Sequence, residues 1–182
     1  MNRIAQQLKE KSIVEYLLYM WSEEDLIRAN HCDMDQIEAL IISQFSEVDK
    51  PSMREWYGNL ITMMEEENVR DKGHLQINTN VIINLTDLHN ELCNSPKFPF
   101  YSAAYFKALP FIVELRTRNG HKDEPEIETC FEAMYGILLL RLQKKAVSKD
   151  TSRAIQVIKE FLMILGEYYY DDKHGKLKLG DD

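Results

Sequence analysis

Residues 126–170, EIETCFEAMYGILLLRLQKKAVSKDTSRAIQVIKEFLMILGEYYY, determine the fold that the rest of the chain adopts. Apolar residues recur there at helical spacing, which predicts two helices, over about 126–145 and 151–170, joined by a short turn. Ser148 or Asp150 is expected to cap the second helix. Gly136 is expected to mark a close crossing with another helix. Both helices are apolar on most sides, so the stretch predicts a hairpin covered by other helices.

Helical periodicity also dominates the preceding residues. It predicts a long helix over 3–29, a short one beginning after Asp33 or Asp35, and further helices over about 53–69, 75–93 and 102–118. Pro110 lies inside the last of these and is expected to kink or split it, because proline removes a helical hydrogen bond. No strand-like alternation occurs. We therefore predict an all-α, single-domain bundle (residues 1–172) of six or seven helices around the hairpin, followed by a polar tail (173–182).

Composition excludes several classes of protein. The 182 residues have a net charge of -8, which argues against a nucleic-acid partner, because sequence-independent binding needs a basic surface. No apolar run reaches the roughly 20 residues of a membrane span, and no signal peptide pattern begins the chain. The three cysteines have no metal-binding or redox spacing, so we expect a reduced, cytoplasmic protein with Cys130 in the core.

Motifs for catalysis or cofactor binding are missing from the sequence. There is no glycine-rich phosphate loop, no nucleophile elbow and no HExxH motif. Two segments, Asp71-x-x-His74 and His121-x-x-Glu124, approach the Glu-x-x-His spacing of carboxylate-bridged metal sites, but both lie in expected turns. We therefore predict no catalytic residue, no metal and no cofactor.

The best polar candidates for a site lie on two expected helices. Asn78 and His89 share a mostly apolar face of the helix over 75–93, and Glu24 and Arg28, spaced as a helical ion pair, continue the apolar face of the first helix. One interpretation is a ligand pocket between helices, lined by apolar groups and a few polar ones. The other is a set of buried polar groups that bond each other, and we favour it because buried polar groups usually have partners.

Two further sets of residues, one aromatic and one on the first helix, are expected to have structural roles only. The aromatic residues Tyr101, Tyr105, Phe106 and Phe111 are expected to pack in the core rather than stack on a flat ligand. The face of the first helix that carries Glu15, Tyr16, Tyr19 and Glu23 is expected to be its wet side.

Five segments together resemble a family. They are EYLLYMW (15–21), KGHLQIN (72–78), TDLH (86–89), FKALPF (106–111) and PEIETCF (125–131). The combination is similar to an uncharacterised bacterial family catalogued as a domain of unknown function, and the resemblance covers nearly the whole chain. It implies a stand-alone cytoplasmic bacterial protein, and it implies no activity, cofactor or site residue.

Three functional hypotheses follow. The first is a protein-interaction or scaffold module, expected to self-associate or to bind another protein through an exposed apolar helix face such as that of the first helix. The alternatives are a small-molecule binding protein with a pocket near Asn78, His89, Glu24 and Arg28, and an enzyme using His89 or His74 as an acid or base.

Overall fold

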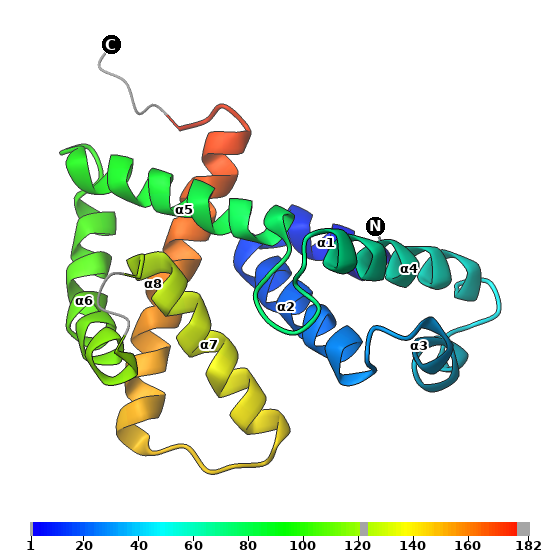
Figure 1. Ribbon diagram of the computed structural model, residues 1–182. Helices are drawn as coiled ribbons and strands as arrows, with labels where there is room; N and C mark the ends of the chain where they lie inside the picture. The colour runs from blue at the N-terminus through cyan, green and yellow to red at the C-terminus, as the bar shows by residue number, and fades with distance from the viewer. Residues whose placement is uncertain (1, 121–123, 178–182) are drawn as a thin grey trace. The chain divides into compact units, whose positions relative to one another are not determined.

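The computed structural model describes residues 2–120 and 124–177, and within them it is all-helical (Figure 1). The helices are α1 (Arg3–Lys11), α2 (Ile13–Ala29), α3 (Met34–Leu40), the short 3-10 helix η1 (Ile42–Gln44), α4 (Lys50–Glu66), α5 (Gln76–Asn94), α6 (Pro99–Asn119), α7 (Glu126–Leu142) and α8 (Lys149–Lys173). The all-α prediction is confirmed. Helix α8 ends at Lys173, and residues 178–182 of the predicted tail (173–182) lie outside the described residues, so the tail stays a prediction.

Two compact units make up the chain. Unit 1 comprises residues 1–11 and 15–80, and unit 2 comprises residues 12–14 and 81–182. In unit 1, α3, η1 and α4 pack on one another. The domain boundaries 1–172 stay a prediction.

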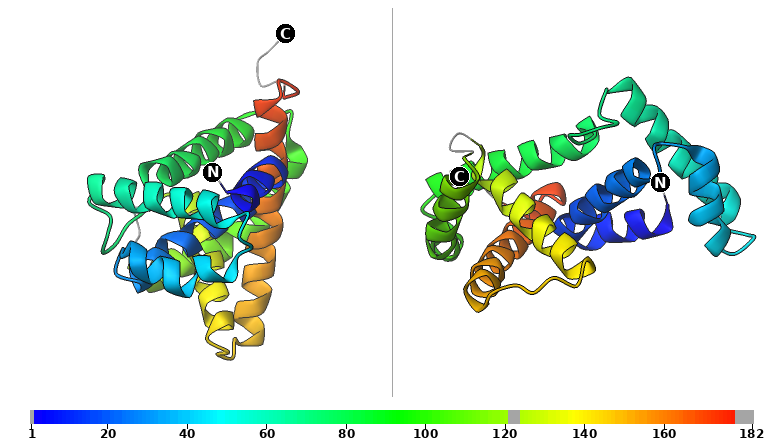
Figure 2. Two further views of the ribbon diagram at one scale, coloured as in Figure 1. Left: turned by 90° about the vertical axis from the view of Figure 1, so that its right-hand side faces the viewer. Right: turned by 60° about the horizontal axis from the view of Figure 1, so that its bottom comes forward.

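The predicted hairpin is the centre of unit 2, where α8 packs against both α7 and α6 (Figure 2). Ser148 caps α8, because its side chain accepts a hydrogen bond from the backbone N–H of Thr151. Phe131 of α7 and Phe161 of α8 are almost completely buried, and so is Cys130, as predicted. The hairpin therefore supplies much of the apolar core of this unit.

The expected first helix is two helices, α1 and α2, which break at Ser12. Neither proline nor glycine marks this break. Ile13 and Val14 at the start of α2 are buried in unit 2, and a Cβ atom at Gly166 of α8 would lie only 3.3 Å from Cγ2 of Val14. A Cβ atom at Gly136 would meet nothing within 4 Å, so the prediction of a close crossing at Gly136 is wrong and the close approach is at Gly166.

Helix α6 runs without a break through Pro110, so the proline does not split it. Pro110 lies on the exposed side of the helix, where water can bond the backbone carbonyl group that the missing N–H leaves unpaired. Tyr101, Ala108 and Ile112 form the opposite, fully buried side.

Candidate functional site

One face of α2 holds the loop between α4 and α5. Arg28 donates hydrogen bonds to the backbone carbonyl oxygens of Val69, at 3.1 Å from Nη2, and of Gly73. Gly73 has a positive φ of 87°, a conformation that glycine adopts without strain. One turn before Arg28 on the same face of α2 is Glu24, and Trp21 stacks on the His74 ring with a centroid distance of 4.1 Å. Three side chains at helical spacing thus fasten this loop to α2.

Glu24 is the central group of this arrangement and is completely buried. Its Oε1 atom accepts hydrogen bonds from the backbone N–H of Leu75 at 3.0 Å and from Nδ2 of Asn78 at 2.6 Å. Its Oε2 atom lies 2.6 Å from Nδ1 of His74. Three partners around one carboxylate compensate for the loss of water on burial.

The predicted site residues therefore separate into two groups. Glu24 and Arg28 bind the loop before α5, and Asn78 in the first turn of α5 binds Glu24. Arg28 pairs with Asp25 at 2.8 Å instead of forming the expected ion pair with Glu24. His89 follows Asn78 on α5 but belongs to unit 2, whereas Asn78 belongs to unit 1. Oδ1 of Asn78 is buried and has no hydrogen-bond partner within residues 2–120 and 124–177. The prediction that these four residues bind a ligand stays a prediction.

A second buried carboxylate lies on the face of α2 that was expected to be wet. Glu23 is only 8% exposed and accepts a hydrogen bond from the Tyr57 hydroxyl at 2.9 Å. Burial raises the pKa of Glu23, while hydrogen bonds from Tyr19 and Tyr57 oppose that rise. Tyr16 is buried too, so the prediction for this face is wrong, although Glu15 is exposed. The sequence signal was the pair of tyrosines at positions 16 and 19, since tyrosines are often buried with a bonded hydroxyl.

His89 is the centre of a polar cluster in unit 2. The Tyr101 hydroxyl lies 2.6 Å from Nδ1 of His89, and Oε2 of Glu126 lies 3.9 Å from Nε2. Glu126 also accepts a hydrogen bond from Tyr105 and lies 3.7 Å from Nη1 of Arg116. Burial lowers the pKa of His89, while the charge of Glu126 opposes this shift.

The arrangement around His89 resembles an acid–base pair, but its access is limited. His89 is 6% exposed, and Tyr101 is completely buried. The rings of Tyr105 and Phe161 pack on the imidazole with centroid distances of 4.8 and 5.7 Å. We interpret this cluster as a hydrogen-bonded part of the core, in agreement with the favoured sequence interpretation.

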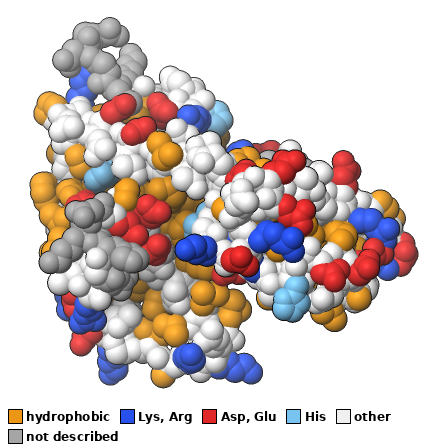
Figure 3. All heavy atoms as spheres, in the orientation of Figure 1, with side chains coloured by type: hydrophobic (Ala, Val, Ile, Leu, Met, Phe, Trp, Pro, Cys, Tyr) orange, Lys and Arg blue, Asp and Glu red, His pale blue; other side chains and the backbone are white. Residues whose placement is uncertain are grey.

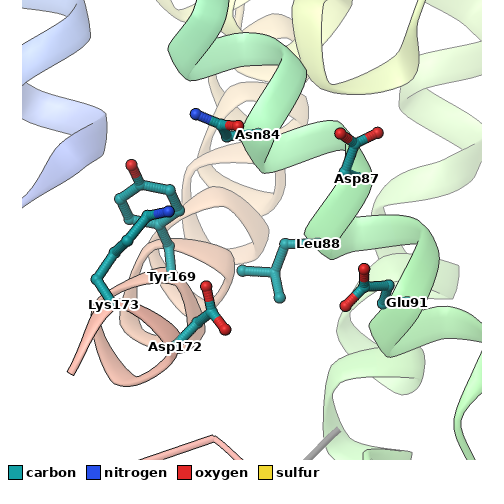
Figure 4. Close-up of a pocket in the computed structure, with 7 residues that line it drawn as sticks. All are labelled: Asn84, Asp87, Leu88, Glu91, Tyr169, Asp172 and Lys173. Atoms are coloured by element: carbon teal, nitrogen blue, oxygen red, sulfur yellow. The ribbon is translucent and has the colours of Figure 1, made fainter. Parts of the chain in front are cut away.

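A surface hollow of about 200 Å³ lies between α5 and the end of α8 (Figure 4). It is lined by Asn84, Asp87, Leu88, Glu91, Tyr169, Asp172 and Lys173. Nζ of Lys173 lies 5.3 Å from the centroid of the Tyr169 ring. The lining is mainly polar and solvent-facing, and within residues 2–120 and 124–177 no group of three His, Cys, Asp or Glu side chains converges as metal ligands.

The outer side of α6 carries a row of exposed apolar residues. Phe106 is 64% exposed and Val113 is 50% exposed. Ala103 and Pro110, also exposed, lie on the same side of the helix. We call these four residues the outer stripe of α6. Hydrophobic side chains reach the surface along the edge of the molecule where α6 lies (Figure 3).

The expectation that Phe106 packs in the core is therefore wrong. Helix α6 has apolar residues on two opposite sides, so its periodicity did not indicate which side faces inward. The buried side packs on the hairpin, and the outer stripe is left exposed.

A comparison with protein-family models matches residues 2–176 to the domain of unknown function DUF4924. The chain belongs to this family. No curated protein and no solved structure showed a match. In this family member, no described helix is both long and apolar enough to cross a membrane.

The pKa of His89 leads to a prediction for this family member. A buried histidine whose pKa is lowered stabilises the fold fully above its unfolded-state pKa of about 6.5, and this stabilisation is lost as the pH falls below that value. We expect His89→Gln to flatten the fall in the free energy of unfolding between about pH 6.5 and 5, where one proton contributes at most about 1.4 kcal/mol per pH unit. Urea denaturation of both proteins across this range measures the difference. Identical pH profiles for the two proteins would contradict the prediction.

Proposed function

We propose that this protein is a protein-interaction module and that the outer stripe of α6 is its binding surface. The observation that supports the proposal most directly is the 64% exposure of Phe106 within an apolar row. Burying a side chain of this size in an interface stabilises a complex by about 1.5–3 kcal/mol. Aromatic residues at the centre of an apolar patch are typical of interfaces.

The predicted location on the first helix has less support. Ile4 of α1 is 47% exposed and Leu26 of α2 is 36% exposed, but they lie on different helices and Leu8 is partly buried. The outer stripe instead places all its apolar residues on one side of one helix. We also propose a cytoplasmic location, which is supported by three cysteines that are all free although two of them are buried.

Site-specific photo-crosslinking tests the proposed surface. Benzoylphenylalanine is placed at Val113 in the stripe, or at the exposed Lys159 of α8 as a control, and each protein is irradiated in an extract of the cells that make it. We expect a discrete adduct from position 113 only, and we expect Phe106→Asp to abolish it. Equal adducts from both positions, or none from position 113, would refute the proposal.

A further inference from the structure

We infer that the partner of the outer stripe is a second copy of this chain, with the two α6 helices antiparallel about a two-fold axis near Pro110. This inference rests on the proposed function, since it names the partner of the same surface. It comes from the order of residues around Pro110. Phe106 precedes Pro110 by one helical turn, and Val113 follows it by nearly one turn.

The apolar residues of the stripe complement themselves in this arrangement. A two-fold axis near Pro110 places Phe106 opposite the second copy's Val113, and the same contact occurs twice, as in any isologous interface. Ala103 and Pro110 have compact side chains, so the two helices can approach closely. A large aromatic residue thus packs against a smaller branched one on each side of the axis.

Charge selects the antiparallel direction. Lys107 and Glu114 both lie beside the stripe, on the same flank of α6. An antiparallel pair brings the same flanks of both helices together and places Lys107 near the second copy's Glu114, again twice. A parallel pair would bring opposite flanks together, so Lys107 and Glu114 would lie apart from the second copy's charges and this ion pair would be lost.

Both charged residues can exchange their present partners. Nζ of Lys107 lies 3.1 Å from Oε2 of Glu160, and Glu114 pairs with Arg118 within α6. These side chains are about half exposed or more, and exposed pairs contribute only about 0–1 kcal/mol. The contact between two single helices is small, so we expect a dimer that dissociates in the micromolar range.

A charge-reversal cycle measured by sedimentation equilibrium of the full chain tests the pairing. We expect a concentration-dependent dimer for the unmodified protein and a monomer for Phe106→Asp with an unchanged circular dichroism spectrum. Lys107→Glu and Glu114→Lys should each weaken the dimer about tenfold, which corresponds to about 1.4 kcal/mol. The double variant should restore dimerisation to within about threefold, because its intermolecular pairs are again of opposite charge. Lys159→Glu, with the same change in net charge, should leave the dimer unchanged.

The double variant excludes effects within one chain. Lys107→Glu creates a repulsion between position 107 and Glu160, and Glu114→Lys creates a repulsion between position 114 and Arg118. Both repulsions within the chain persist in the double variant, so they cannot account for a restored dimer. A monomeric unmodified protein, or a dimer that Phe106→Asp does not affect, would overturn the inference, as would a double variant without restored affinity. A monomer that still gives the specific adduct from position 113 would overturn self-pairing alone, whereas loss of the adduct would remove the proposed function as well.

Discussion

Glu24→Ala is expected to destabilise the protein by about 3–5 kcal/mol, as is typical when one member of a buried hydrogen-bonded charge arrangement is removed. The carboxylate is completely buried and binds His74, the Leu75 backbone and Asn78. Its removal leaves these three polar groups without their acceptor, at a cost of about 1–3 kcal/mol each where they stay buried. Urea denaturation measures the loss, and the amide hydrogen of Leu75 should exchange faster with solvent.

Two variants serve as controls for Glu24. Glu24→Gln keeps an oxygen toward Leu75 and Asn78 and places an amide nitrogen near Nδ1 of His74, so its loss of stability should be less than half that of Glu24→Ala. Asp25→Ala removes the adjacent carboxylate, whose side chain is 43% exposed, and should cost no more than about 1 kcal/mol. Equal losses for Glu24→Ala and Asp25→Ala would show that the loop does not depend on Glu24.

Phe161→Ala should also cost about 3–5 kcal/mol, because it leaves a large cavity in the centre of unit 2. Phe161 is 1% exposed, and its ring lies between those of Tyr101, Tyr105 and His89, with centroid distances of 5.7–5.8 Å. The same substitution should also perturb the near-ultraviolet circular dichroism of the tyrosines. Chemical denaturation at neutral pH measures the loss of stability.

Phe106→Ala is the matched control, since it removes the same side chain from the exposed outer stripe. We expect a change in stability within about 0.5 kcal/mol, as is usual for surface substitutions, together with weaker self-association. Phe161→Ala should therefore lower mainly the stability, and Phe106→Ala mainly the self-association. A large loss of stability in dilute Phe106→Ala would contradict the assignment of the outer stripe to an interface.

Part of the candidate site could be predicted from the sequence. Glu24, Arg28, Asn78 and His89 were identified as polar residues on apolar helix faces, and the structure shows that each has bonded partners. Their partners were not predictable, because Glu24 and Asn78 are 54 positions apart and no local pattern relates them. The partners of His89 were not predictable either, because Glu126 and Tyr101 come from other helices.

The helical class and the hairpin of α7 and α8 follow from local sequence patterns alone. A repeat of apolar residues every three to four positions is a local property, and it requires a helix with one side covered. The break at Ser12, the close approach at Gly166 and the outward side of α6 depend instead on packing between distant parts of the chain. Helix α6 is apolar on two sides, so its orientation depends on which side fits the hairpin, and this is set by packing between residues that are distant in the sequence.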